Sequence, residues 1–188
     1  MNGTELCYTE SDDKLHDECG VAGVFFSAPH DTKDEQQMNA ATLAYYGLYS
    51  LQHRGQEGGG IATFDEEGKS YRHRGQGLLS EVFTNGEIGE LKGSMGVGSV
   101  KYANASKGGP ENVEPLYFRH KSGNFVVAGE GNLVNAKQIA DYLEKHGTIF
   151  QTETDSELLA HLIKKNYNED RIDRIVKALN MMEGGFSR

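Results

Sequence analysis

The feature that most constrains this chain is an abrupt change from polar to apolar sequence at Cys19. Residues 1–18 are polar and acidic, whereas residues 20–26 form an apolar, glycine-containing run that is typical of a buried strand. We therefore expect a leader over residues 1–18 and a folded domain over 19–188. Cleavage before Cys19 would place a free α-amino group, of pKa about 7.7 to 8.0, beside its own thiol. The plainer alternative is a buried structural cysteine, because free cysteine often packs as a small hydrophobe.

Length and charge exclude several classes of function. The 188 residues correspond to about one domain, and 28 acidic against 19 basic residues argue against nucleic-acid binding. No apolar run approaches the roughly 20 residues of a membrane helix, and no secretory signal precedes Cys19, so we expect a cytoplasmic protein without membrane contact. Cys7 lies in the leader and no zinc-type spacing occurs. We expect no metal and no cofactor in this chain.

Hydrophobic periodicity and turn signals predict hairpins followed by helices. Strands are expected at 19–26, 60–64, 69–74, 96–103, 116–119 and 124–128, and helices at 36–52, 136–146, 158–165 and 171–182. Asn135 is a candidate N-cap, Thr154 and Glu157 fit a capping box, and Tyr45, Tyr46 and Tyr49 form a stripe expected to pack on a sheet. Grouped hairpins with segregated helices indicate an α+β layered domain rather than a doubly wound parallel sheet. Residues 184–188 look like the start of another strand, so we expect the domain to be incomplete at its C-terminus.

Five motifs occur in the order and spacing of one family. They are CGVAG at 19–23, YGLYSLQHRGQE at 46–57, GQGLLSEVF at 75–83, GNLVNA at 131–136 and TDSE at 154–157. From about residue 19 to its end the chain resembles the N-terminal glutaminase domain of the glutamine phosphoribosylpyrophosphate amidotransferases. These are class II glutamine amidotransferases of the N-terminal-nucleophile hydrolase superfamily. The resemblance implies a four-layer αββα sandwich and a propeptide removed before Cys19.

The resemblance also implies a reaction and its partners. Glutamine would be hydrolysed to glutamate and ammonia through a γ-glutamyl thioester. The ammonia would pass to a phosphoribosyltransferase domain, in cis or in trans, that makes phosphoribosylamine for purine synthesis. That domain is absent from these 188 residues, and the family's iron–sulfur ligands and nucleotide sites would lie outside them. A homo-oligomer is a further possibility.

Site residues follow from the resemblance position by position. Cys19 is the implied nucleophile, Gly131 supplies an oxyanion N–H, Asp155 binds the substrate α-amino group and Arg54 lies beside the nucleophile. Each has a plainer alternative: Gly131 as a turn glycine, Asp155 as part of a helix cap, and Arg54 as a charge at a helix C-terminus. A dyad of Cys19 with His53 or His161 is disfavoured, because the cysteine amine already supplies the base in this family.

Two positions of the implied active site depart from the residues of the family. SVKYAN at 99–104 replaces H-V-R-Y-x-T, so Lys101 stands for the arginine that grips the substrate carboxylate, with Asn104 as a further substrate-binding candidate. Glu130 stands for the oxyanion asparagine. Loss of such a donor costs about 10² to 10³ in rate, and a carboxylate adds repulsion of up to about 4 kcal/mol at roughly 4 Å.

Two interpretations of Glu130 remain open. It stays protonated and donates a hydrogen bond, or it forms an ion pair with Lys101 that occupies the glutamine site, which we favour. The chain is accordingly either a glutaminase domain or a catalytically impaired amidotransferase-like module that binds a ligand or supports a transferase.

Overall fold

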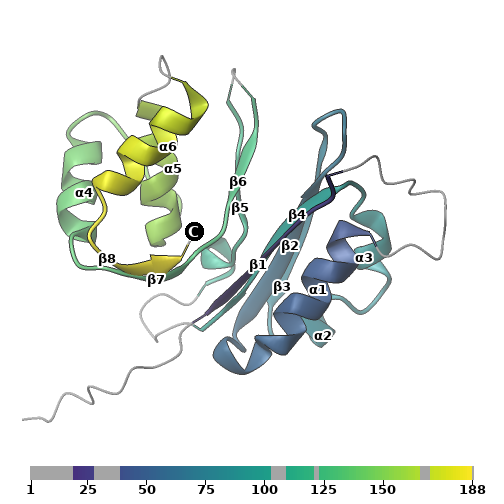
Figure 1. Ribbon diagram of the computed structural model, residues 1–188. Coiled ribbons are helices and arrows are strands. Elements are labelled where there is room, and N and C mark those ends of the chain that lie inside the picture. Colours follow the sequence, from purple (N-terminus) through teal and green to yellow (C-terminus); the bar gives the residue numbers. More distant parts are fainter. Residues whose placement is uncertain (1–18, 28–38, 103–108, 121–122, 166–169, 188) are drawn as a thin grey trace, which may run out of the picture.

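The protein is described by a computed structural model, which covers residues 19–27, 39–102, 109–120, 123–165 and 170–187 (Figure 1). Its helices are α1 (Ala40–Ser50), α2 (Leu79–Val82), α3 (Glu87–Glu90), α4 (Ala136–Glu144), α5 (Asp155–Lys165) and α6 (Arg171–Asn180), with 3-10 turns η1 (Gln52–Arg54) and η2 (Pro110–Asn112). Its strands are β1 (Gly20–Phe25), β2 (Gly58–Phe64), β3 (Ser70–Gln76), β4 (Met95–Lys101), β5 (Leu116–Phe118), β6 (Phe125–Val127), β7 (Glu130–Leu133) and β8 (Gly184–Ser187).

These elements form four layers. Helices α1 to α3 cover one side of a four-stranded sheet, the β5–β6 hairpin lies on the other side, and α4 to α6 form the outer layer beyond it (Figure 1). The order helix, sheet, sheet, helix is the αββα sandwich of the N-terminal-nucleophile hydrolases. The α+β fold class predicted from the sequence is therefore confirmed.

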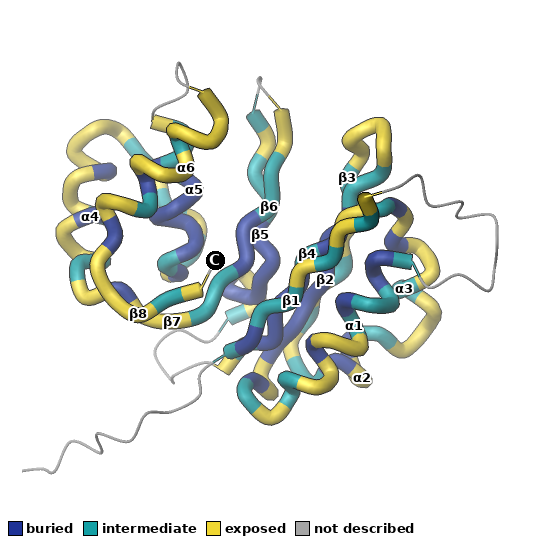
Figure 2. The backbone as a smooth tube through the Cα atoms, in the orientation of Figure 1, coloured by how far each residue is buried: buried dark blue, intermediate teal, exposed yellow. Residues whose placement is uncertain are grey.

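The four-stranded sheet is antiparallel throughout, in the order β1-β4-β2-β3. Gly20 lies opposite Val100, and Ile61 lies opposite Gly98. Strand β2 is central and is buried along nearly its whole length (Figure 2). A strand covered on both faces reads as a continuous small or apolar run, which is how GGGIATF differs from the alternating pattern of β3.

A first hydrophobic core lies between α1 and the four-stranded sheet. Small residues at helical spacing on α1 allow the helix to approach the strands closely, and the fully buried Leu48 fills the space beneath it. The cluster consists of Ala41, Ala44, Leu48, Ile61, Leu79, Leu91 and Val100. Tyr46 and Tyr49, expected to pack on the sheet, are instead 57% and 59% exposed. Tyr45 packs against the edge of this core, as predicted, but the prediction was wrong for Tyr46 and Tyr49, because alanines form most of the buried face of the helix.

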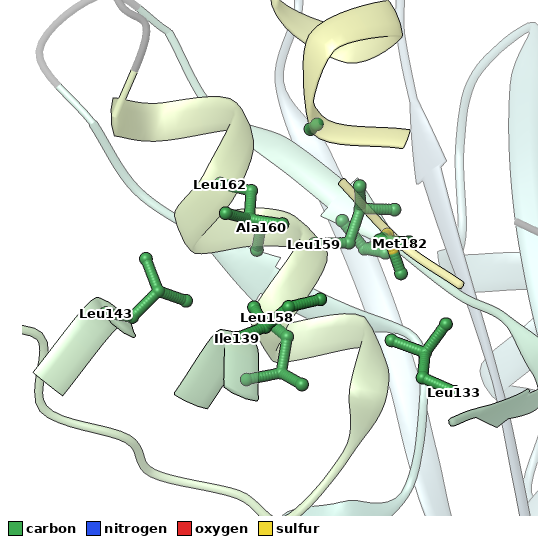
Figure 3. Packing of buried hydrophobic residues seen from close by; sticks show 10 residues of the cluster. Leu133, Ile139, Leu143, Leu158, Leu159, Ala160, Leu162 and Met182 are labelled. Atoms are coloured by element: carbon green, nitrogen blue, oxygen red, sulfur yellow. The ribbon is translucent and has the colours of Figure 1, made fainter. Parts of the chain in front are cut away.

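A second core holds the outer helices against β6 and β7 (Figure 3). It is built largely from apolar residues of α5, which is buried along most of its first two turns. The buried members are Val127, Leu133, Ile139, Leu143, Leu158, Leu159, Ala160, Leu162, Ala178 and Met182. The first core therefore packs against the four-stranded sheet, and the second packs against β6 and β7.

Element boundaries differ from the sequence expectations at several ends. Helix α1 begins at Ala40, because Asn39 is extended and its side chain accepts from Thr42 N at 2.7 Å. Asn135 precedes α4 but makes no side-chain cap; its amide instead binds the chain at Met181 and Glu183. Strand β7 and the short helices α2 and α3 were not predicted. The strand expected at the C-terminal end is present as β8, which pairs with β7.

Candidate functional site

Cys19 lies immediately before β1, at the end of the four-stranded sheet. Its backbone N–H donates to Arg54 O at 3.0 Å, and its thiol donates to Tyr102 O at 3.7 Å. Its φ of 67° falls in the left-handed region, which costs a non-glycine residue on the order of 1 to 3 kcal/mol. The cysteine is therefore held in an unfavourable backbone conformation by the segments on both sides of it.

The QHRG segment at 52–55 forms one of these neighbouring segments. Gln52 Oε1 accepts from Leu79 N at 2.8 Å, and its Nε2 donates to Gly55 O, so one side chain ties the η1 turn to α2. Gly55 is required by close approach, because a Cβ atom there would lie 2.7 Å from the backbone of Lys101. These contacts explain how the segment places the Arg54 carbonyl against Cys19.

A cavity of about 170 Å³ opens beside Cys19. The described residues that line it come from β4, the loop before β5, strand β7 and the start of α5. They are Cys19, Ser99, Val100, Lys101, Tyr102, Glu114, Gly129, Glu130, Gly131, Asn132, Thr154, Asp155 and Ser156. Segments more than 100 residues apart in the sequence thus share one pocket, and this pocket is the candidate active site.

Four predicted site residues take part in this pocket with Cys19, and Arg54 adjoins it. Gly131 has a φ of 105°, and a Cβ atom there would fall 2.1 Å from Gly185 O, so the strand pairing of β7 with β8 requires glycine. Asp155 begins α5, and its Oδ2 accepts from Leu133 N at 2.9 Å. The structure thus brings Gly131 and Asp155 to the nucleophile, while Asn104 and residues 1–18 lie outside the described residues.

Arg54 reaches the pocket through Glu130. Its Nη2 lies 3.4 Å from Glu130 Oε1, and the two side chains are 27% and 19% exposed. The ion pair of Glu130 with Lys101 stays a prediction. Lys101 Nζ donates to Asn112 O at 2.7 Å. The structure therefore shows Arg54 as an ionic partner of the Glu130 carboxylate, at the position predicted from the sequence to contribute to the oxyanion site.

Sequence reasoning missed two buried polar residues of the site. Asn112, 3% exposed, accepts from Lys101 Nζ through its carbonyl and from Glu153 N through its Oδ1 at 2.9 Å. Glu114, 5% exposed, accepts from Gly129 N at 2.6 Å and so holds the turn that leads into Glu130. The available signal was a polar segment directly before a predicted strand, which is too weak to assign a role.

The capping box at the start of α5 forms only in part. Glu157 N donates to Thr154 Oγ1 at 3.4 Å, but the Glu157 carboxylate turns to the preceding loop, where it accepts from Gln151 N and from Thr152 N. Glu157 is 2% exposed and also lies 3.4 Å from His161 Nε2. His161 packs between Phe118 and Phe150, and neither it nor His53 is among the described residues that line the Cys19 pocket.

The described residues hold no group of three or more His, Cys, Asp or Glu side chains arranged to bind a metal ion. In the same part of the chain, no helix has the length and apolar character needed to cross a bilayer.

Comparison with known proteins identifies the family. Residues 106–187 match the model of a glutamine amidotransferase domain. The chain is 47% identical over 174 residues to amidophosphoribosyltransferase of Bacillus subtilis strain 168, covering 92% of this chain and 34% of that protein. It is 41% identical to the amidophosphoribosyltransferase of Lacticaseibacillus casei, covering 92% of this chain and 84% of the relative.

Solved structures agree with this assignment. The chain superimposes with a TM-score of 0.77, at 44% identity, on glutamine phosphoribosylpyrophosphate amidotransferase from Bacillus subtilis complexed with ADP and GMP, covering 88% of this chain and 33% of that one. A structure of the allosteric regulatory enzyme of purine biosynthesis gives a TM-score of 0.79 at 46% identity, over 89% of this chain and 34% of the other. The chain thus spans about a third of the length of the Bacillus subtilis relative. It carries the family's glutamine amidotransferase fold and motifs, and it belongs to the amidophosphoribosyltransferase family.

Proposed function

We propose that this chain is a class II glutaminase domain in which Cys19, freed at its amino group, hydrolyses the side-chain amide of its substrate. The supporting observation is that Cys19 lines the same pocket as Gly131 and Asp155. Its nitrogen lies 3.0 Å from Arg54 O, a carbonyl that would hold the freed amine in place beside the thiol.

The reaction proceeds in two balanced steps. The α-amine takes the thiol proton as sulfur attacks the amide carbon, and the proton then passes to the departing nitrogen, so ammonia leaves and a thioester forms. Water attacks the thioester with the amine again as base, which releases the acid and restores the thiol. The Gly131 N–H donates to the oxyanion in both steps.

The wider role follows from the relatives. We assign the ammonia to a phosphoribosyltransferase domain in cis or in trans, for phosphoribosylamine formation in purine biosynthesis in the cytoplasm. Support for this part of the proposal is the Bacillus subtilis relative, an amidophosphoribosyltransferase about three times as long as the matched segment.

A second candidate function is a binding module with little turnover. It is favoured by one observation, the Glu130 carboxylate that lines the pocket where the family has an oxyanion donor. In this case the pocket binds a ligand or stabilises the fold of a longer enzyme without releasing ammonia at an enzyme-like rate.

The test combines processing with reactivity in the full-length protein. Intact mass establishes whether residues 1–18 are removed, and an electrophilic glutamine analogue labels Cys19 if the thiol is activated. We expect a processed chain whose labelling and ammonia release disappear in Cys19→Ser. An unprocessed chain with an unlabelled Cys19 would overturn the glutaminase and support the binding module.

A further inference from the structure

The side chain of Gln52 belongs to the turn that holds Cys19, and the reaction described above gives it no role. Gln52 begins the η1 turn, and both ends of its carboxamide are bonded: Oε1 accepts from Leu79 N at 2.8 Å, and Nε2 donates to Gly55 O. An amide that uses its acceptor and its donor on two separate segments keeps those segments in register. Gln52 therefore joins the η1 turn to the first residue of α2.

The contact at Leu79 is a firm anchor. The side chain of Leu79 is fully buried in the first core, and a Cβ atom on Gly59 of the central strand would come 2.8 Å from its Cδ2. The N–H groups at the start of a helix have no intrahelical acceptor, so Gln52 Oε1 satisfies one of them. This contact gives a role to the GQGLLSEVF motif at 75–83, which supplies none of the described residues that line the Cys19 pocket.

The other contacts of Gln52 fix the carbonyl that meets Cys19. Arg54 O accepts from Cys19 N at 3.0 Å, and the peptide unit that carries this oxygen also carries Gly55 N, which donates to Gln52 O at 3.2 Å. The next carbonyl, Gly55 O, accepts from Gln52 Nε2. Because a peptide unit is planar, holding its N–H and the carbonyl that follows it sets the direction of Arg54 O.

The direction of Arg54 O matters for the base of the proposed reaction. The freed Cys19 amine must be neutral to take the thiol proton, and its lone pair must face the thiol. An N–H donated to Arg54 O orients the amine, and a carbonyl acceptor stabilises the ammonium more than the neutral amine. The carbonyl thus affects both the orientation of the base and the pH at which it becomes active.

From these contacts we propose that Gln52 is a positioning residue for the glutaminase reaction, acting through Arg54 O on the amine of Cys19. The inference rests on the proposed function, because only a processed Cys19 has a free amine. It extends that function by connecting the base to the first hydrophobic core through Leu79.

Two substitutions of Gln52 test this role in the full-length protein. Gln52→Met keeps nearly the same length and shape but lacks the amide donor and acceptor, and Gln52→Asn keeps the amide but is too short to reach both partners. We expect kcat for ammonia release to fall about tenfold in each variant, with KM changed by less than about twofold. Gln138→Met, at an exposed position of α4, is the matched control and should leave both constants unchanged.

The pH profile separates positioning from a general loss of structure. Because the amine must lose its proton to act, kcat/KM should rise with pH through the pKa of the amine. Loss of the carbonyl acceptor disfavours the ammonium, so in both Gln52 variants the midpoint of this rise should move to a pH about 0.5 lower. Damage to folding alone lowers the rate at every pH and leaves the midpoint in place.

Nuclear magnetic resonance with isotope-labelled cysteine gives the same midpoint without turnover, by titrating the Cys19 amine in the processed protein. A midpoint unchanged in both variants overturns the inference, and so does a raised KM with kcat retained. The glutaminase proposal is judged separately, by intact mass and by labelling of Cys19 in the unsubstituted protein. A processed and labelled protein whose Gln52 variants keep the original pH profile refutes the role of Gln52 and leaves the glutaminase standing.

Discussion

Arg54 Nη2 and Glu130 Oε1 lie 3.4 Å apart although the two residues are separated by 76 positions in the sequence. The contact joins the η1 turn, whose carbonyl holds Cys19, to the first residue of β7. Because both side chains are largely buried, the pair keeps a carboxylate at the position that the sequence comparison predicts for an oxyanion donor. The electrostatics beside the nucleophile therefore depend on Arg54 as well as on Glu130.

Replacing this carboxylate by the family's amide should raise turnover. Glu130→Asn removes a negative charge from the developing oxyanion and supplies a donor, and one such donor is worth about 10² to 10³ in kcat. Ammonia release at saturating substrate measures the effect. Glu90→Asn, at an exposed position of α3, is the matched control. Unchanged turnover in Glu130→Asn would show that the carboxylate does not limit the reaction.

Gly55 should be intolerant of a side chain because β4 passes directly beside it. A Cβ atom would lie 2.7 Å from the backbone of Lys101, so Gly55→Ala must displace either the η1 turn or the strand. We expect a loss of about 1 to 3 kcal/mol in the free energy of unfolding by urea. Gly23→Ala, where nothing lies within 4 Å, should change it by less than about 0.5 kcal/mol. Equal effects at the two glycines would contradict the close approach.

Asp170 should make the start of α6 sensitive to acid. Its side chain accepts from Ile172 N at 2.9 Å, and this bond is the main reason why the pKa of Asp170 is lowered from its ordinary value of 3.8. A lowered carboxyl pKa stabilises the folded state above the unfolded value, and this stabilisation is lost as pH falls through the folded value. The cap should therefore weaken below about pH 3.8.

The test compares Asp170→Asn, which keeps a capping side chain without a charge, with the unsubstituted protein. At pH 7 the aspartate should be the more stabilising because its charge favours a helix N-terminus, and the difference in unfolding free energy should vanish in acid. Asp141→Asn, which lies in the body of α4 and caps no helix, is the matched control. A difference that stays constant from pH 7 to pH 3 would rule out the titrating cap.

Much of the fold was predictable because local patterns carried it. The two strand-like runs at 60–64 and 69–74 and the turn between them predicted the β2–β3 hairpin, and helix-end signals with hydrophobic periodicity predicted α4, α5 and α6. Strand β7 was missed because its four residues, EGNL, have no strand pattern of their own. They become a strand only by pairing with β8, more than 50 residues later.

The candidate site, like the fold, was predictable from the sequence in part. The sequence by itself determined the motifs that identify the family, and it predicted the nucleophile Cys19 and the two departures at Lys101 and Glu130, because these depend on residue identity and spacing. Only the tertiary structure decided that Glu130 meets Arg54, that Lys101 binds the Asn112 carbonyl, and that Glu114 and the buried Ser99 hydroxyl line the same pocket. Ion pairs and buried polar contacts depend on distances of a few ångströms between remote segments, and those distances are set by how the strands and layers pack together.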